Sequence, residues 1–175
     1  MRRDVNQKIL LTGRPGCGKT TLVKRVANKL EQPAGGFYTE EIRERGQRVG
    51  FKLVTLDGEE AVFAHVNFKT SERLGKYGLA LSALETAGLG AIREALCERR
   101  LVVLDEIGPM ELRSATFRDV VTDAFDSCVS ILATITARPF PFTNALKRRR
   151  GVTLIEVRRE NQEQLVSELS DQFKA

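Results

Sequence analysis

The stretch Gly13-Arg14-Pro15-Gly16-Cys17-Gly18-Lys19-Thr20 fits the pattern G-x-x-x-x-G-K-[S/T] at every fixed position. A short apolar run, Lys8-Ile9-Leu10-Leu11-Thr12, precedes it, and apolar residues at helical spacing follow from Lys19 onward. The run predicts a buried strand and the spacing predicts a helix, so the loop joins a strand to a helix. A loop of this sequence in this place is typical of a polyphosphate-binding site.

Each fixed position of the loop meets a physical demand of polyphosphate binding. Glycines let the backbone wrap closely around an anion and point several N–H groups at it. The helix that begins at Lys19 adds the positive end of its dipole. We expect Lys19 to reach the β- and γ-phosphates of a nucleoside triphosphate, and the Thr20 hydroxyl to ligate Mg²⁺. The nucleotide contacts predicted on this side are Gly13, Arg14, Pro15, Gly16, Cys17, Gly18, Lys19, Thr20 and Thr21.

A second candidate element follows an apolar strand near the middle of the chain. The run Leu101-Val102-Val103-Leu104 has no polar alternation, and Asp105-Glu106 follows it directly. Such a strand is typical of a parallel sheet, and ligands of open α/β folds bind at its carboxyl edge. The alternative is a solvated strand end. A phosphate loop in the same chain favours Asp105 as a second Mg²⁺ ligand and Glu106 as the base that polarises water. The nucleotide contacts predicted here are Val103, Leu104, Asp105, Glu106, Ile107, Gly108 and Pro109.

Two arginines are candidates for neutralising the charge that builds up during phosphoryl transfer. Arg138 follows the apolar run that ends in Thr136, so we expect it at the same edge of the sheet. Arg14, in the loop itself, is a weaker candidate, and a surface role remains the alternative for both. The predicted catalytic residues are therefore Lys19, Glu106 and Arg138.

Strands that alternate with helices predict an α/β fold with a mostly parallel sheet and right-handed crossovers. Residues 36–66 do not follow this alternation of strands and helices. Strand-like runs there flank Asp57-Gly58, a dipeptide that favours a two-residue hairpin turn. We interpret this segment as an antiparallel meander inserted after the first helix. Residues 67–80 are expected to form a loop, and residues 81–100 a helix interrupted near Gly88 and Gly90. The whole chain, 1–175, is interpreted as a single domain.

Composition and charge narrow the class of protein further. The chain has a formal net charge of +5, and the excess is spread along most of its length. We interpret it as serving polyphosphate binding and solubility. The run Lys147-Arg148-Arg149-Arg150 has no aromatic residues interleaved, so we expect a solvated face and no nucleic-acid partner. No apolar run has the length of a signal peptide or a membrane span, and the three cysteines have no metal-binding spacing. These features favour a cytoplasmic protein without a membrane partner.

Several stretches spread along almost the whole chain resemble the small thermophile-type nucleoside-triphosphatases, whose animal members are called cancer-related nucleoside-triphosphatase. The resemblance implies hydrolysis of ATP, GTP and other nucleoside triphosphates with Mg²⁺ and little base preference, on a RecA-related P-loop sheet. The chain departs from the family pattern at Pro109, where many relatives carry lysine, and at Thr143-Asn144, where acidic residues are frequent. The stretches that carry the resemblance are Thr12-Gly-Arg-Pro-Gly-Cys-Gly-Lys-Thr-Thr21, Gly36-Phe-Tyr-Thr-Glu-Glu-Ile-Arg43, Gly50-Phe-Lys, Thr55-Leu-Asp-Gly58, Gly75-Lys-Tyr-Gly78, Asp105-Glu-Ile-Gly108, Met110-Glu-Leu112 and Arg159-Glu-Asn161.

Two other classes of function also fit these residues. A nucleotide-switched interaction module would bind a triphosphate and a protein partner, with hydrolysis as a timer. A kinase would pass the γ-phosphate to an acceptor that the sequence does not identify. The chain has no Asn-Lys-x-Asp stretch to select guanine and no Arg-rich lid of a small-molecule kinase. We therefore expect weak discrimination between bases.

Overall fold

Parallel strands with buried side chains form the centre of the protein. The computed structural model describes residues 6–174, and the charged residues Arg2, Arg3 and Asp4 that begin the chain lie outside this range. The side chains of β8 are buried along its whole length, as is expected for a strand covered on both faces. The parallel strands lie in the order β2 (Ala34–Glu44), β7 (Leu101–Ile107), β8 (Ile131–Ile135), β1 (Lys8–Thr12) and β9 (Val152–Glu156).

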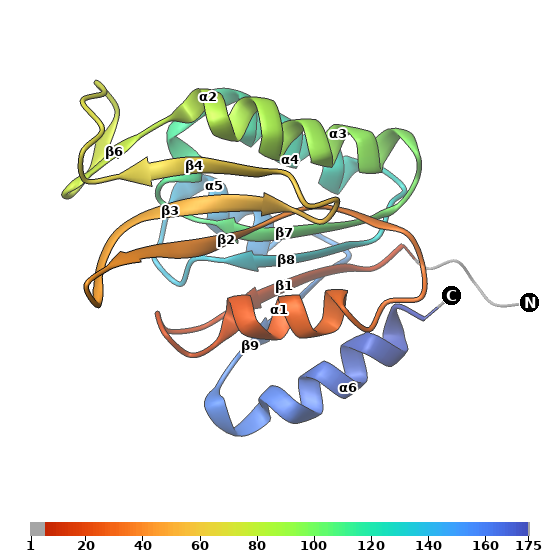
Figure 1. Cartoon of the computed structure of the whole chain (residues 1–175). Coiled ribbons are helices and arrows are strands. Elements are labelled where there is room, and N and C mark those ends of the chain that lie inside the picture. The colour runs from red at the N-terminus through yellow and green to blue at the C-terminus, as the bar shows by residue number, and fades with distance from the viewer. Residues whose placement is uncertain (1–5, 175) are drawn as a thin grey trace, which may run out of the picture.

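The sheet continues beyond β2 as antiparallel strands, which project to one side of the molecule (Figure 1). β3 (Gln47–Thr55) pairs with β2, and β4 (Glu60–His65) pairs with β3. Two short strands, β6 (Tyr77–Leu79) and β5 (Arg73–Leu74), complete the edge. The predicted α/β fold is confirmed, and its sheet is mixed. The loop expected over residues 67–80 thus contains a hairpin whose strands are too short to give a sequence pattern.

The two-residue hairpin turn predicted at Asp57-Gly58 is wrong. β3 ends at Thr55 and β4 begins at Glu60, so the connection is longer, and the Gly58 N–H donates to the Thr55 carbonyl at 3.0 Å. The two-residue turn lies instead between β2 and β3, where Arg45 has φ 48° and Gly46 has φ 78°. Both positions of such a turn need positive φ, which a non-glycine residue adopts at a cost. Gly46 indicates a turn at this place in the sequence, whereas nothing in the sequence indicates the positive φ at Arg45.

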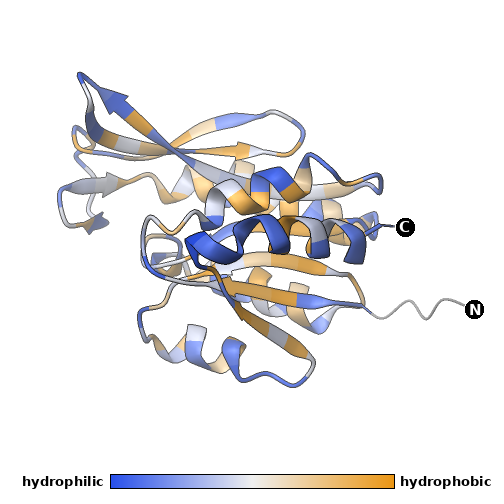
Figure 2. Ribbon diagram, turned by 90° about the horizontal axis from the view of Figure 1, so that it is seen from below, coloured by the Kyte–Doolittle hydropathy of each residue, from blue (hydrophilic) through white to orange (hydrophobic). Residues whose placement is uncertain are grey.

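Helices cover both faces of the sheet (Figure 1). On one face lie α1 (Lys19–Ala27) and α6 (Gln162–Gln172), which pack on β1, β7 and β8. On the other face lie α3 (Leu89–Cys97), α4 (Ala115–Asp126) and α5 (Pro141–Lys147). Figure 2 shows hydrophobic residues along the central strands and hydrophilic residues on the outer sides of the helices. Burial of these two apolar layers is the main term that stabilises the fold.

Shorter helical turns complete the chain. α2 (Leu81–Ala83) runs through a π-helical turn, Leu84–Gly88, into α3, so the expected interruption of this helix is one widened turn that ends at Gly88. Turns of 3-10 helix occupy Glu111–Arg113, directly before α4, and Arg159–Asn161, directly before α6. Within residues 6–174, no helix has the length and apolar character that crossing a membrane requires.

The strand register brings distant polar residues to one edge of the sheet. Ala133 of β8 is the register partner of both Leu10 in β1 and Leu104 in β7. The residues that follow these strands therefore lie together at their carboxyl ends. The loop that begins at Gly13 and the Asp105 carboxylate therefore lie at the same edge of the sheet, although they are far apart in the sequence.

Candidate active site

The loop between β1 and α1 has the backbone geometry of an anion-binding turn. Gly13, Gly16 and Gly18 have φ values of 154°, 75° and 95°, a region that favours glycine. A Cβ built on Gly13 would lie 2.7 Å from the Val157 carbonyl oxygen, so any side chain there would displace the backbone directly after β9. The first turn of α1 carries no acidic residue, and no side chain caps it at Gly18. The free N–H groups and the positive end of α1 are therefore available to an anion.

Lys19 lies inside this loop. Its side chain is buried to 9% relative exposure, and its Nζ donates to the carbonyl oxygens of Gly13 at 3.0 Å and Arg14 at 3.4 Å. The ammonium is thus held over the concave side of the loop. In this place it can contribute its full positive charge to a bound polyphosphate.

Asp105, near the end of β7, accepts hydrogen bonds from residues of three other elements. Its carboxylate is fully buried, and Thr20 Oγ1 donates to Oδ2 at 2.9 Å. Thr134 Oγ1 donates to Oδ1 at 2.6 Å, and the N–H and hydroxyl of Thr39 each lie 3.4 Å from Oδ2. Burial raises the pKa of Asp105, and the hydrogen bonds from Thr134 and Thr20 oppose this rise. Together they fix the orientation of the carboxylate.

Thr39 and Thr134 were missed when the sequence was read alone. Thr134 follows Ala133, the register partner of Leu104, and Thr39 lies two residues past Phe37, which is also a partner of Leu104. Their proximity to Asp105 depends on the order of the strands. The sequence marks Thr134 as a threonine in an otherwise apolar run, and it marks Thr39 as part of the stretch Gly36-Phe-Tyr-Thr-Glu-Glu-Ile-Arg43 that carries the family resemblance.

Glu106 and Glu111 bring two carboxylates together beside Gly108. A Cβ built on Gly108 would lie 2.8 Å from Glu106 Oε1 and 3.1 Å from Glu111 Oε2. Burial and the charge of Asp105 raise the pKa of Glu106, whereas Lys19 lowers it. Burial, followed by the charge of Glu106, raises the pKa of Glu111 to about 8. Glu111 lies in Met110-Glu-Leu112, a stretch that carries the family resemblance, but the sequence does not predict it as a site residue because its burial depends on the fold.

Three of the predicted nucleotide contacts have buried side chains. Val103, Leu104 and Ile107 are exposed by 0%, 2% and 0%, and they pack in the two apolar layers of the sheet. Their side chains therefore hold the strand that carries Asp105 and Glu106, and contact between their backbone and a nucleotide stays a prediction. Pro15 and Thr21 are exposed beside the loop, and Gly108 and Pro109 lie in the turn after β7.

The two candidate arginines are not part of the buried cluster. Arg138 is exposed, and it lies two residues after Thr136, the last buried residue of the segment that includes β8. Its backbone N–H donates to Thr136 Oγ1 at 3.2 Å. Arg14 is exposed in the loop. Within the part of the chain that the structure describes, no ion pair joins either guanidinium to Asp105 or Glu106. A catalytic role for Arg138 therefore stays a prediction.

The donor set at Thr20 and Asp105 fits Mg²⁺. Both side chains offer hard oxygen donors, and a hydroxyl that donates its proton to Asp105 presents its lone pairs to a cation. Among residues 6–174, no group of three or more His, Cys, Asp or Glu is arranged to hold a metal ion. Mg²⁺ usually takes one or two protein oxygens and completes its shell with water and substrate phosphates, which matches so small a donor set.

Comparison with known proteins assigns the chain to a family. A family model described as NTPase matches residues 8–170. The chain belongs to this family. The nucleoside-triphosphatase THEP1 of Thermotoga petrophila is 49% identical over 162 residues, which cover 93% of this chain and 90% of that protein.

Two solved structures of related proteins have the same fold. The crystal structure of THEP1 from the hyperthermophile Aquifex aeolicus aligns with a TM-score of 0.87 at 35% identity, over 97% of this chain and 100% of that one. The solution structure of a human cancer-related nucleoside triphosphatase aligns with a TM-score of 0.80 at 32% identity, over 95% and 96%. The family resemblance inferred from the sequence is thereby confirmed.

Proposed function

We propose that this protein hydrolyses nucleoside triphosphates to diphosphates and phosphate, with Mg²⁺, at the edge of the sheet where β1 and β7 end. The observation that carries the proposal is the hydrogen bond from Thr20 in the loop to the buried Asp105. It joins a polyphosphate-binding loop to a carboxylate that suits a metal. Membership of the NTPase family, and the activity in the names of its THEP1 relatives, support the same reaction.

Each residue of the cluster has a distinct part in this proposal. The loop N–H groups and Lys19 bind the β- and γ-phosphates, and Thr20 and Asp105 hold Mg²⁺. When bound, Mg²⁺ supplies positive charge that offsets the charge on the phosphates and the departing diphosphate. Glu106 orients and deprotonates the attacking water, which its raised pKa favours. Arg138 remains a candidate for neutralising charge on the γ-phosphate.

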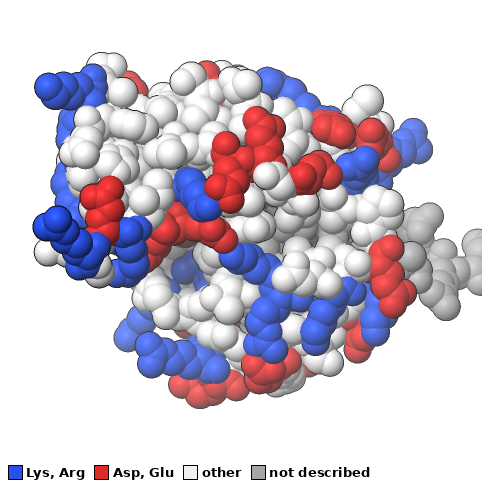
Figure 3. Space-filling view, viewed as in Figure 1, with Lys and Arg blue, Asp and Glu red and all other residues white. Residues whose placement is uncertain are grey.

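The strand order supports a RecA-related P-loop assignment for the single domain proposed over residues 1–175. β8 separates β1, which leads into the loop, from β7, which carries Asp105 near its carboxyl end. The substrates are nucleoside triphosphates, and no nucleic-acid partner is proposed. On the face shown in Figure 3, positive and negative side chains are intermixed.

One assay tests the proposal and its low base specificity. Phosphate release from ATP, GTP, CTP and UTP should depend on Mg²⁺, and the four values of kcat/KM should fall within about two orders of magnitude. A preference of roughly 10⁴ for one base would contradict the expected tolerance, since only a dedicated hydrogen-bonding site achieves it. Phosphate release that occurs only with an added acceptor would instead indicate a kinase.

A further inference from the structure

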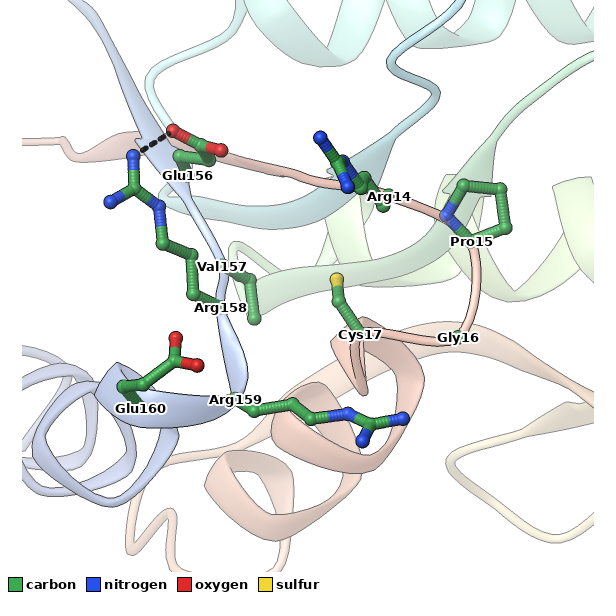
Figure 4. A pocket seen from close by; sticks show the side chains of 9 residues that line it. All are labelled: Arg14, Pro15, Gly16, Cys17, Glu156, Val157, Arg158, Arg159 and Glu160. Carbon is green, nitrogen blue, oxygen red and sulfur yellow. Dashed lines mark hydrogen bonds and ion pairs between the residues drawn. The ribbon is translucent and has the colours of Figure 1, made fainter.

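A pocket lies beside the phosphate loop, between it and the connection from β9 to α6 (Figure 4). Its volume is about 530 Å³, within the roughly 300–1,000 Å³ typical of small-molecule sites. Arg14, Pro15, Gly16 and Cys17 line one side. The other side is lined by Glu156, Val157, Arg158, Arg159 and Glu160.

Two hydrogen bonds fix the walls of this pocket relative to each other. The Val157 N–H donates to the Thr12 carbonyl at 2.7 Å, which ties the end of β9 to the start of the loop. Gln162 Nε2 donates to the Cys17 carbonyl, which ties the start of α6 to the middle of the loop. The loop and the β9–α6 connection therefore form one preorganised surface.

The position of the pocket indicates which part of a nucleotide it receives. The reacting γ-phosphate belongs beside Thr20, Asp105 and Glu106, and none of these residues lines the pocket. The opposite end of the triphosphate carries the nucleoside. The pocket touches the loop at Arg14–Cys17 and is lined by neither Asp105 nor Glu106, so it is placed for the ribose and base.

Two neighbouring arginines in the pocket differ in their contacts. Arg158 is bonded to Glu156 at 2.7 Å, so its guanidinium is already paired. Within residues 6–174, no carboxylate forms an ion pair with Arg159. Figure 4 shows Arg159 extended toward the loop below Cys17, whereas Arg158 points toward Glu156. Arg159 thus lines the pocket as an exposed side chain, and its planar guanidinium has no carboxylate partner within residues 6–174.

Resting on the proposed function above, we propose that this pocket binds the nucleoside of the substrate and that the Arg159 guanidinium stacks on the face of the base. A guanidinium plane stacks on any base, because every base has a π face. Binding by the face rather than the edge gives affinity without strong selection. Weak base discrimination is therefore a property of this pocket and not of the phosphate loop.

The test compares ADP with inorganic tripolyphosphate, which has the phosphates but no nucleoside. Titration calorimetry with Mg²⁺ measures binding of both to the wild type, Arg159→Ala and Arg159→Lys. Both variants should bind ADP about 5- to 100-fold more weakly, the range expected for one lost stacking contact, and should bind tripolyphosphate as the wild type does. Arg93→Ala, on the exposed side of α3, is the matched control and should change neither.

Each other outcome overturns the assignment in its own way. Equal weakening of ADP and tripolyphosphate by Arg159→Ala would mean that Arg159 binds phosphate. Full rescue by Arg159→Lys would mean that charge and not stacking matters. ADP binding unchanged in Arg159→Ala, or no ADP binding by the wild type, would also contradict it. Binding is measured here without turnover, so loss of the proposed hydrolysis would be seen separately, as ADP binding without phosphate release from ATP.

Discussion

Thr20 Oγ1 donates a 2.9 Å hydrogen bond to Asp105 Oδ2, although 85 positions separate the two residues in the chain. The bond fixes two things at once. It orients the Thr20 hydroxyl so that its lone pairs are free for a cation, and it fills one acceptor site of a carboxylate that has no access to water. The loop and β7 are thereby held in register at the edge of the sheet.

Removal of the Thr20 hydroxyl should weaken the use of Mg²⁺. In Thr20→Ala, we expect the Mg²⁺ concentration for half-maximal phosphate release to rise by on the order of tenfold or more. Mutation of a residue that only supports a metal ligand already lowers metal affinity by about tenfold, and Thr20 is expected to be a ligand itself. Thr20→Ser keeps the hydroxyl and should stay close to the wild type. Equal Mg²⁺ requirements in Thr20→Ala and the wild type would remove Thr20 from the metal site.

The raised pKa of Glu111 predicts a pH-dependent stability. Its pKa lies at about 8 in the folded protein and near 4.5 in the unfolded chain. Between these values the folded state binds more protons, so its free energy of unfolding falls as pH rises, by at most about 1.4 kcal/mol per pH unit, and the contribution is lost above pH 8.

Glu111→Gln removes this titrating group, so its free energy of unfolding should fall less steeply with pH, and the slope that remains comes from other groups with raised pKa such as Asp105 and Glu106. Urea denaturation of the two proteins from pH 5 to pH 9, without nucleotide or Mg²⁺, measures the difference. Glu94→Gln, at an exposed position of α3, is the matched control and should keep the wild-type slope. Parallel pH profiles for the wild type and Glu111→Gln would show that Glu111 ionises normally.

The three cysteines give an internal test of where nucleotide binds. Cys17 lines the pocket beside the loop, whereas Cys97 and Cys128 are exposed elsewhere. ADP with Mg²⁺, at ten times its Kd, should slow the alkylation of Cys17 by iodoacetamide about tenfold, because only the unbound fraction reacts. Peptide mass spectrometry reads all three thiols, and the rates at Cys97 and Cys128 should not change. Unprotected Cys17 would place the nucleotide elsewhere.

The sequence alone predicted the parts of the site that local chemistry specifies. The fixed spacing of Gly13, Lys19 and Thr20, after an apolar run, indicated a loop between a strand and a helix, and the structure has β1 and α1 there. The apolar strand before Asp105 was recognised for the same reason. Both patterns consist of residues that are close together in the chain, so they can be recognised in a single sequence.

The supporting contacts could not be predicted in this way. Thr39 and Thr134 reach Asp105 because β2 and β8 flank β7, and strand order leaves no local pattern. The position of Arg159 beside the phosphate loop could not be predicted either, because the pocket is formed by two segments near opposite ends of the chain. The same limit applies to Val103 and Leu104, which directly precede Asp105 and whose side chains are buried in the core.

The two adjacent carboxylates of β7 should differ in what their loss does. Asp105→Asn removes charge from the metal site, so it should weaken Mg²⁺-dependent nucleotide binding as well as turnover. Glu106 acts on water, which matters only as the bond breaks. Its loss should leave nucleotide binding nearly unchanged.

Single-turnover hydrolysis of ATP by Glu106→Gln, with ATP affinity measured in parallel, tests the proposed hydrolysis most directly. We predict an affinity close to that of the wild type and a rate of hydrolysis lower by roughly 10²–10⁴, the usual contribution of a positioned general base. Hydrolysis by Glu106→Gln at the wild-type rate would contradict the proposed mechanism and assign the activation of water to another group.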